Sequence, residues 1–160
     1  MPQGLDSDMI INKILYAGQP NYQEMEIETQ DTIAPGRLLI KGTAQYQCKI
    51  AGATTMECIG VADVMADRKL TLMQTETAAG TPLDYYDAKD QIRVIRGDVI
   101  VKLLLLSGQT ITVGERVEAA ANGMIQTETA DGSGAAIGYA VEDSGGATTT
   151  CDWILVKLII

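Results

Sequence analysis

The sequence predicts a mainly β fold, a small β-barrel or β-tulip-like domain built from short strands. The first observation is a series of short runs in which apolar and polar residues alternate, separated by glycine-containing turns. This pattern is typical of half-buried strands. The second is that no amphipathic helical spacing of apolar residues persists over three turns. Many short strands with little helix favour a barrel or a sandwich.

Ten segments have the alternation expected of strands. In chain order they are Glu24–Glu28, Leu38–Ile40, Gln45–Ile50, Gly60–Val64, Lys69–Gln74, Gln91–Ile95, Val99–Leu105, Met124–Glu128, Ala136–Val141 and Cys151–Ile159. Turns are expected between them, because glycine, asparagine and aspartate adopt the backbone conformations that tight turns need. The turn sites are Pro35-Gly36, Arg96-Gly97-Asp98, Ser107-Gly108, Asn122-Gly123, Asp131-Gly132 and Gly145-Gly146.

Composition limits the classes of partner. A chain of 160 residues with 46% hydrophobic content can bury a real core, as one domain or two small ones. Its net charge of −9 argues against nucleic acid as a partner, because phosphate binding needs clustered cations. The longest apolar stretches, Val99–Leu106 and Trp153–Ile160, each contain a lysine and are far shorter than the roughly 20 residues of a membrane span. No membrane partner is expected. Lys102 and Lys157, the lysines of these two apolar stretches, are expected to point outward from the fold.

The start of the chain has two aspartates and no basic leader ahead of an apolar core. It therefore does not resemble a secretory signal, and synthesis in the host cytoplasm is expected. Three cysteines, Cys48, Cys58 and Cys151, cannot all pair within one chain. Reduced, buried thiols are favoured over a Cys48–Cys58 bridge, which would need the two Cα atoms within about 7 Å.

Catalytic chemistry finds little support in the sequence. The chain has no histidine, which excludes Ser-His and Cys-His nucleophile pairs. The best candidate for an ion site is Asp84, Asp87 and Asp90, which one helical turn could bring to one side. An acidic, solvated connection between strands is the favoured interpretation of these three residues. We expect no enzyme activity, no cofactor and no metal.

One run near the C-terminus carries a family resemblance. Asp131-Gly132 is a turn signal, and it is followed by small residues and the alternating segment Ala136-Ile137-Gly138-Tyr139-Ala140. This run resembles the phage head-decoration, or capsid-cement, proteins, whose lambda-like members have a similar stretch; the residues that carry the motif are Asp131, Gly132, Ala136, Ile137, Gly138 and Ala140. The resemblance extends over about residues 107–160 and is weaker over residues 33–66. It implies a homotrimer that binds the major capsid protein on the exterior of the virion.

Two motifs recur at one offset. Ile33-Ala34-Pro35-Gly36-Arg37-Leu38 is echoed by Ile111-Thr112-Val113-Gly114-Glu115-Arg116-Val117, and Ile59-Gly60-Val61-Ala62 by Ile137-Gly138-Tyr139-Ala140. Gly114 follows Gly36 by 78 positions, and Gly138 follows Gly60 by the same number. A shared offset favours an internal repeat of two similar β units, about residues 33–83 and 107–160.

The first 32 residues differ from the rest, because prolines and glycines interrupt an apolar group there. We therefore divide the chain into an N-terminal arm, residues 1–32, and a β-rich domain, residues 33–160. The resemblance implies that the arm binds the capsid; its apolar residues are Leu5, Met9, Ile10, Ile11, Ile14, Leu15 and Tyr16. The alternative is that Met9–Tyr16 caps the protein's own barrel.

The sequence thus predicts a capsid decoration protein that bridges major capsid subunits and stabilises the head by binding alone. One alternative is another virion β-module, such as a tail, fibre or adhesion domain. Arg96-Gly97-Asp98 matches an integrin-recognition tripeptide, but it stands where a turn leads into the apolar strand Val99–Leu105, and turn chemistry explains it. A metal-dependent enzyme using Asp84, Asp87 and Asp90 is the remaining alternative.

Overall fold

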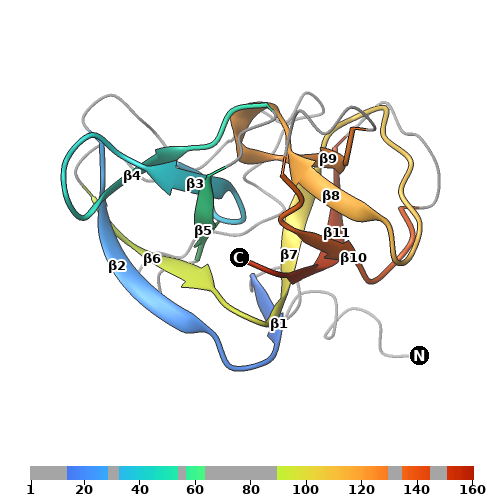
Figure 1. The fold of residues 1–160 in the computed structure, drawn as a ribbon, viewed down its shortest axis with the longest axis horizontal. Helices are drawn as coiled ribbons and strands as arrows, with labels where there is room; N and C mark the ends of the chain where they lie inside the picture. Colours follow the sequence, from blue (N-terminus) through green and yellow to red (C-terminus); the bar gives the residue numbers. More distant parts are fainter. Residues whose placement is uncertain (1–13, 29–32, 54–56, 64–89, 130–134, 145–150) are drawn as a thin grey trace.

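The structure is a computed structural model that describes residues 14–28, 33–53, 57–63, 90–129, 135–144 and 151–160. Its strands form two five-stranded rings, which lie next to each other (Figure 1). Among the described residues, the helical structure is a single 3₁₀ turn, η2, at Ala121–Gly123. The predicted small all-β barrel fold is confirmed. None of these residues belongs to a helix long and apolar enough to cross a membrane.

The first barrel consists of β2 (Asn21–Ile27), β3 (Leu38–Lys41), β4 (Gln47–Ile50), β5 (Cys58–Ala62) and β6 (Gln91–Arg96). Around the ring the order is β2-β4-β3-β5-β6, and β6 closes it by pairing with β2. The β2–β4 pair is parallel and the other pairs are antiparallel. Alternate side chains of these strands fill the interior. The buried interior residues include Met25, Ile27, Leu39, Cys48, Ala62, Ile92 and Val94.

The second barrel consists of β7 (Ile100–Leu105), β8 (Arg116–Ala119), β9 (Ile125–Thr127), β10 (Gly138–Ala140) and β11 (Asp152–Leu158). Its strands follow one another as β7-β11-β10-β8-β9, and a β7–β9 pairing closes this ring. Again one pair, β7–β9, is parallel. A further strand, β1 (Leu15–Ala17), is added to β7 outside the ring. The apolar strands Val99–Leu106 and Trp153–Ile160 are covered in this barrel, as the sequence requires.

The two barrels have the same topology, with β2 to β6 corresponding to β7 to β11 in chain order. The correspondence extends to single hydrogen bonds. The Gly36 N–H donates to the Ala62 carbonyl at 2.8 Å, and the Gly114 N–H donates to the Ala140 carbonyl at 2.8 Å. Both partners of the second bond lie 78 positions after those of the first. The internal repeat is therefore present in the backbone as well as in the sequence, but its two units begin at β2 and β7 and not at residues 33 and 107.

A glycine allows close approach of two strands at the same place in each barrel. A Cβ atom on Gly60 would lie 2.5 Å from the Ile95 carbonyl oxygen, and one on Gly138 would lie 2.2 Å from the Lys157 carbonyl oxygen. Both distances are well below van der Waals contact. Glycine in the repeated Ile-Gly pair is thus required by the backbone of the neighbouring strand.

The first barrel packs against the second through the outer side of three strands. Leu38, Val61 and Ile95 are direct cross-strand partners on β3, β5 and β6, and all three are fully buried. They belong to the same apolar cluster as the interior of the second barrel. The η2 turn adds to this contact, because the Gly123 N–H donates to the Ala51 carbonyl at 2.8 Å. The two barrels are therefore held together by a continuous apolar core.

The strand predictions are confirmed for nine described segments, with ends that differ by a few residues. Two strands were missed. β8 has the sequence Arg-Val-Glu-Ala, too short to show an alternation by itself, and β1 lies among residues that the sequence indicated as irregular. The predicted strand Lys69–Gln74 and the turns at Asp131-Gly132 and Gly145-Gly146 lie outside the described residues.

The three cysteines, all of them in the part of the chain that the structure describes, form no disulfide, and Cys48 is fully buried. Cys48 and Cys58 lie on β4 and β5, and β3 separates them, because Lys41 is opposite Cys48 and Ile40 is opposite Cys58. Two residues separated by an intervening strand lie about 9.5 Å apart, which is longer than the Cα–Cα distance that a disulfide can bridge. Burial raises the pKa of the Cys58 thiol to about 11.

Replacing Gly138 with alanine should destabilise the protein by about 3 kcal/mol, because the β10 and β11 backbones must separate to admit the Cβ atom. Gly108→Ala is the matched control. Gly108, unlike Gly138, has a positive φ of 80°, and its Cβ would meet no atom within 4 Å, so the cost there is conformational, about 1 kcal/mol. Denaturant unfolding of both variants measures the difference. Equal losses would contradict the close-approach explanation.

The Cys58 thiol should make stability depend on pH above neutrality. Its pKa is raised from 9.0 to about 11, so its contribution is fully present below pH 9 and is lost as the pH rises through 11. Wild type should therefore lose more of its melting temperature than Cys58→Val between about pH 8 and about pH 10.5. Thermal unfolding of both proteins checks this, since all other titratable groups are shared. Parallel losses would show that the thiol ionises equally in the folded and unfolded chains.

Candidate interaction surfaces

The described end of the predicted arm packs on the protein itself. Ile14 is fully buried in the core cluster of the second barrel, and Leu15, on β1, is opposite Val101 on β7. Tyr16 is 54% exposed. This is the arrangement expected if the end of the segment caps the barrel. The other predicted arm residues, Leu5, Met9, Ile10 and Ile11, lie outside the described residues.

The predicted arm boundary at residue 32 lies too far along the chain. Residues 21–27 are strand β2, which pairs with both β4 and β6 and closes the first barrel. Met25 and Ile27 point into that barrel and are buried. The physical reason is closure, because without β2 two neighbouring strands would have open edges. The barrel domain therefore includes residues that the sequence assigned to the arm.

The residues of the decoration-family motif contribute to the interior and the backbone of β10. Ile137 and Ala140 are 2% exposed, and Gly138 lies against the β11 backbone. Ala136 is partly exposed just ahead of the strand. Asp131 and Gly132 lie outside the described residues. The described motif residues thus stabilise the second barrel and present little side-chain surface to a partner.

The acidic residues considered for an ion site are only partly placed. The Asp90 carbonyl oxygen accepts a hydrogen bond from the Ile27 N–H at 2.9 Å, which ties the start of β6 to β2. Asp84 and Asp87 lie outside the described residues. In the part of the chain that the structure describes, no three histidine, cysteine, aspartate or glutamate residues form a group that could hold a metal ion.

The Arg96-Gly97-Asp98 tripeptide links the two barrels, and its interpretation as a turn is confirmed. β6 ends at Arg96, and Gly97 turns the chain with a φ of 106°. The Gly97 N–H donates to the Ile160 carbonyl at 2.8 Å. Asp98, 82% exposed in its side chain, pairs with the Lys157 ammonium at 3.3 Å.

A surface of the second barrel, here called the open face, is formed by Val113, Gly114, Arg116, Tyr139 and Lys157. Tyr139 on β10 lies directly opposite Arg116 on β8 and Lys157 on β11, so the three side chains form one row across three strands. All five residues are exposed. The two cations make ion pairs at the rim of the row, Arg116 with Glu128 at 3.4 Å and Lys157 with Asp98 at 3.3 Å.

The equivalent face of the first barrel is buried. The 78-residue offset relates Val113, Gly114, Arg116 and Tyr139 to Pro35, Gly36, Leu38 and Val61, and Lys157, opposite Tyr139, corresponds to Ile95, opposite Val61. All five residues of the first barrel are buried, and Leu38, Val61 and Ile95 belong to the apolar cluster of the second barrel. The environment of Gly36 shows how tightly this face is covered. A Cβ atom there would lie 2.5 Å from the Trp153 ring and 3.1 Å from the Ile14 side chain. Among the described residues, the same location in the fold is therefore buried at the interface in the first barrel and exposed in the second.

The β3–β4 turn of the first barrel is a second exposed surface. Tyr46 has a positive φ of 62° and is 63% exposed. Beside it, the Gln47 side-chain amide donates to Glu26 Oε1 at 2.9 Å, and the Thr43 hydroxyl donates to Glu28. The Thr43 bond is the main cause of a lowered pKa of Glu28; the Lys49 charge lowers it further, and burial opposes both.

A cation lies between two partners on the outside of the first barrel. The Arg93 guanidinium contacts Asp63 at 2.6 Å and lies over the Tyr22 ring at 4.3 Å from its centroid. Asp63 is 6% exposed. Because the carboxylate is buried and the contact is close, this cluster joins β5, β6 and β2 and stabilises ring closure.

The second barrel also contains charged groups with structural roles. Glu118 lies on the outer side of β8 and is fully buried. Its carboxylate accepts a hydrogen bond from the Gln126 side-chain amide at 2.8 Å. Lys102 points outward from β7 but is partly covered, and this burial lowers the pKa of its ammonium while the Glu142 charge opposes the shift. The expectation of outward-pointing lysines is confirmed for the exposed Lys157.

Sequence reasoning found neither the open face nor the β3–β4 turn. The signal for the open face was available, because the 78-residue offset aligns apolar Leu38 and Val61 with Arg116 and Tyr139. A polar residue at the repeat position of a buried one indicates a surface with a different environment. Which copy is covered could not be read from the offset alone.

No protein-family model and no curated protein sequence matches the chain. Among solved structures, the chain is similar to the N base of the head fiber gp8.5 in bacteriophage phi29, with 13% sequence identity and a TM-score of 0.52. The similarity covers 88% of this chain and 94% of that chain. At this identity the two proteins share a fold, and the match includes both barrels.

Proposed function

We propose that this protein is a structural component of a bacteriophage virion that binds the outside of the assembled head. The observation that carries the proposal is the similarity in fold, over 88% of the chain, to the base of a phage head fiber. The resemblance of residues 107–160 to head-decoration proteins points to the same location on the virion.

The proposed activity is that of a decoration, or cement, protein. It would bind the major capsid protein as a homotrimer and bridge neighbouring capsid subunits. A protein that binds the assembled shell and not its free subunits stabilises the shell by mass action. The outer face of the first barrel and the interior of the second belong to one apolar cluster, so the two barrels can transmit load between two attachment points without moving apart. No catalytic residue or cofactor is part of this mechanism.

The alternative is that the chain forms the base of a fibre, or a tail or adhesion module. The same structural neighbour favours it, because that protein is itself a head fiber base. The two functions differ in what the bound protein does to the shell. A cement protein raises the resistance of the head to heat or chelators, whereas a fibre base attaches to the head and supports a projecting domain.

Replacing Leu5, Met9, Ile10 and Ile11 with serine should abolish binding to expanded, undecorated shells and leave the fold intact. The substitution removes apolar side chains that we assign to the capsid contact, and it spares Ile14, which is part of the core. Co-sedimentation with shells measures binding, and thermal unfolding checks the fold.

Ile159→Ser is the matched control, since Ile159 is a half-exposed apolar residue outside the N-terminal segment. It should bind shells as wild type does. Shell binding by the fourfold variant would refute the assignment of the arm. Failure of wild type to bind shells would favour the tail or adhesion alternative, and binding that leaves the melting temperature of the shells unchanged would favour a fibre base.

A further inference from the structure

In the second barrel, a strand from outside the ring covers one edge of β7. β7 pairs with β11 along one side and, near its end, with β9 on the other side, at Leu105. β1 covers the first part of that other side, where Leu15 is opposite Val101 (Figure 1). The Lys102 N–H donates to the Ile14 carbonyl at 2.8 Å. The start of β7 therefore has backbone partners on both sides.

The equivalent edge of the first barrel is on β2. Tyr22 is opposite Ile95 on β6. Ile100, 78 positions after Tyr22, is opposite Lys157 on β11, so β2 and β7 correspond residue by residue. β4 pairs with β2 only near its end, from Glu26 onward. Among the described residues, no strand covers the start of β2 as β1 covers the start of β7.

This uncovered edge, here called the β2 edge, consists of residues 22–24. In an antiparallel pair, the N–H and C=O groups of successive residues point alternately toward the partner strand and away from it. The Ile27 N–H donates to the Asp90 carbonyl, toward β6, so the backbone groups of Tyr22 and Glu24 point away from β6. Glu24 corresponds to Lys102, whose N–H is bound by β1. In the described part of the chain, the Glu24 N–H has no such acceptor.

The side chains beside the β2 edge favour a cationic partner. Glu24 is exposed, and none of the ion pairs among the described residues includes its carboxylate. Arg93, directly opposite Glu24 on β6, is paired with Asp63 at 2.6 Å and lies over the Tyr22 ring. The charge of Glu24 is therefore available to a partner, and the net charge of −9 acts in the same direction.

An exposed strand edge binds an extended segment, because backbone hydrogen bonds supply affinity and alternate side chains supply specificity. β1 shows the form that such a segment takes on this fold: it is antiparallel, with Leu15 partly buried and Tyr16 exposed. Residues 1–13 of a second copy fit the acidic edge poorly, since their charged side chains are Asp6, Asp8 and Lys13. The segment therefore comes from a different protein.

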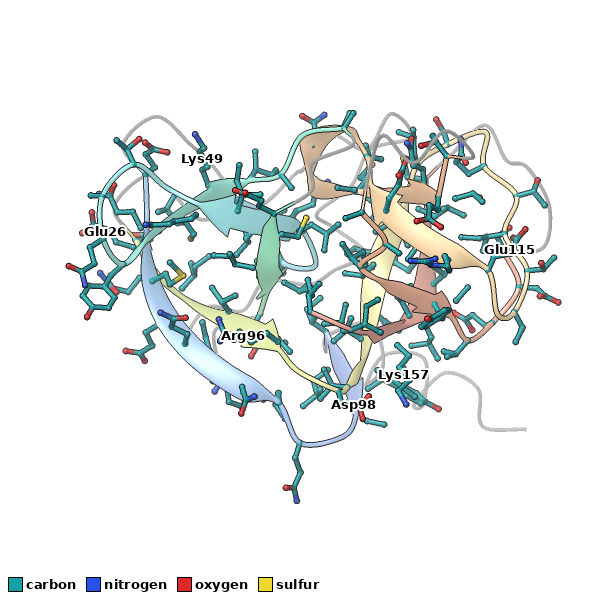
Figure 2. All side chains as sticks on the ribbon, viewed as in Figure 1. Glu26, Lys49, Arg96, Asp98, Glu115 and Lys157 are labelled. Atoms are coloured by element: carbon teal, nitrogen blue, oxygen red, sulfur yellow. The ribbon has the colours of Figure 1, made fainter. Side chains whose placement is uncertain are left out.

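We propose that an extended, basic segment of the shell protein adds to the β2 edge as a strand. The segment runs antiparallel to β2, accepts a hydrogen bond from the Glu24 N–H and places a lysine or arginine beside the Glu24 carboxylate. The identity of the partner rests on the proposed attachment to the head. The contact is additional to that of the N-terminal segment and lies on the other barrel. Figure 2 shows Glu26, at the end of β2, and Lys157, on the second barrel, far apart along the long axis.

Amide hydrogen exchange of the free protein, followed by NMR, tests whether the edge is open. The Glu24 amide should be at least about tenfold less protected than the Lys102 amide, because only Lys102 has an acceptor on that side. Equal protection of the two amides would overturn the proposal, since the β2 edge would then be covered already.

Co-sedimentation with expanded, undecorated shells tests the partner. Glu24→Pro removes the N–H on the open side and leaves the β2–β6 hydrogen bonds in place. Glu24→Thr is the matched control, because it removes the carboxylate and keeps the N–H. Binding should be weaker by at least about tenfold for Glu24→Pro and by only about two- to fivefold for Glu24→Thr. Thermal unfolding checks that both variants are folded.

A measurement on wild type needs no substitution. Hydrogen exchange read by mass spectrometry should show that residues 22–24 become protected when the protein is bound to shells. Unchanged exchange there, or binding by Glu24→Pro as tight as that of wild type, would overturn the β2 contact and leave the proposed attachment standing. Equal losses for the two variants would also overturn it, because the carboxylate and not the backbone would then make the contact. Failure of wild type to bind shells would refute the attachment itself, and with it the shell protein as the partner.

Discussion

Leu38, Val61 and Ile95 face away from the interior of their own barrel and are nevertheless fully buried, because the second barrel covers them. Burial of each aliphatic side chain contributes about 2 kcal/mol. The link between the barrels, around Gly97, is very short. If the two barrels moved apart, these three side chains would be exposed to water. Ile14, the η2 turn and Trp153 all pack at or near the same contact.

This contact also breaks the symmetry of the repeat. The two barrels share topology, the close approach at Gly60 and Gly138, and the hydrogen bonds around Gly36 and Gly114. They differ on one outer face, which is buried against the second barrel in the first barrel and exposed in the second. Closure of a small barrel depends on backbone geometry and is retained in both copies, whereas the outer side chains follow the solvent exposure of each copy.

Much of the fold follows from short-range patterns. Alternation located β6 and β11 well, because each has six or more residues with one face in a barrel. It failed for β8, where four residues contain only two that face the interior. The boundary of the arm was misplaced because prolines and glycines around residues 18–20 suggested an irregular segment, although β2 begins directly after them. For the candidate surfaces, the repeat offset identified equivalent positions but not their exposure.

The sequence by itself determined the all-β class, most strands and the two-unit repeat, because strand alternation, glycine turns and a constant offset are local or periodic properties of the chain. Tertiary structure alone decided how the units close and meet. The parallel β2–β4 and β7–β9 pairs join strands that are not neighbours in the sequence, and no local pattern specifies them. The burial of Leu38 and the exposure of Arg116, residues at one position of the repeat, depend on which barrel lies against the other, a property of the folded chain as a whole.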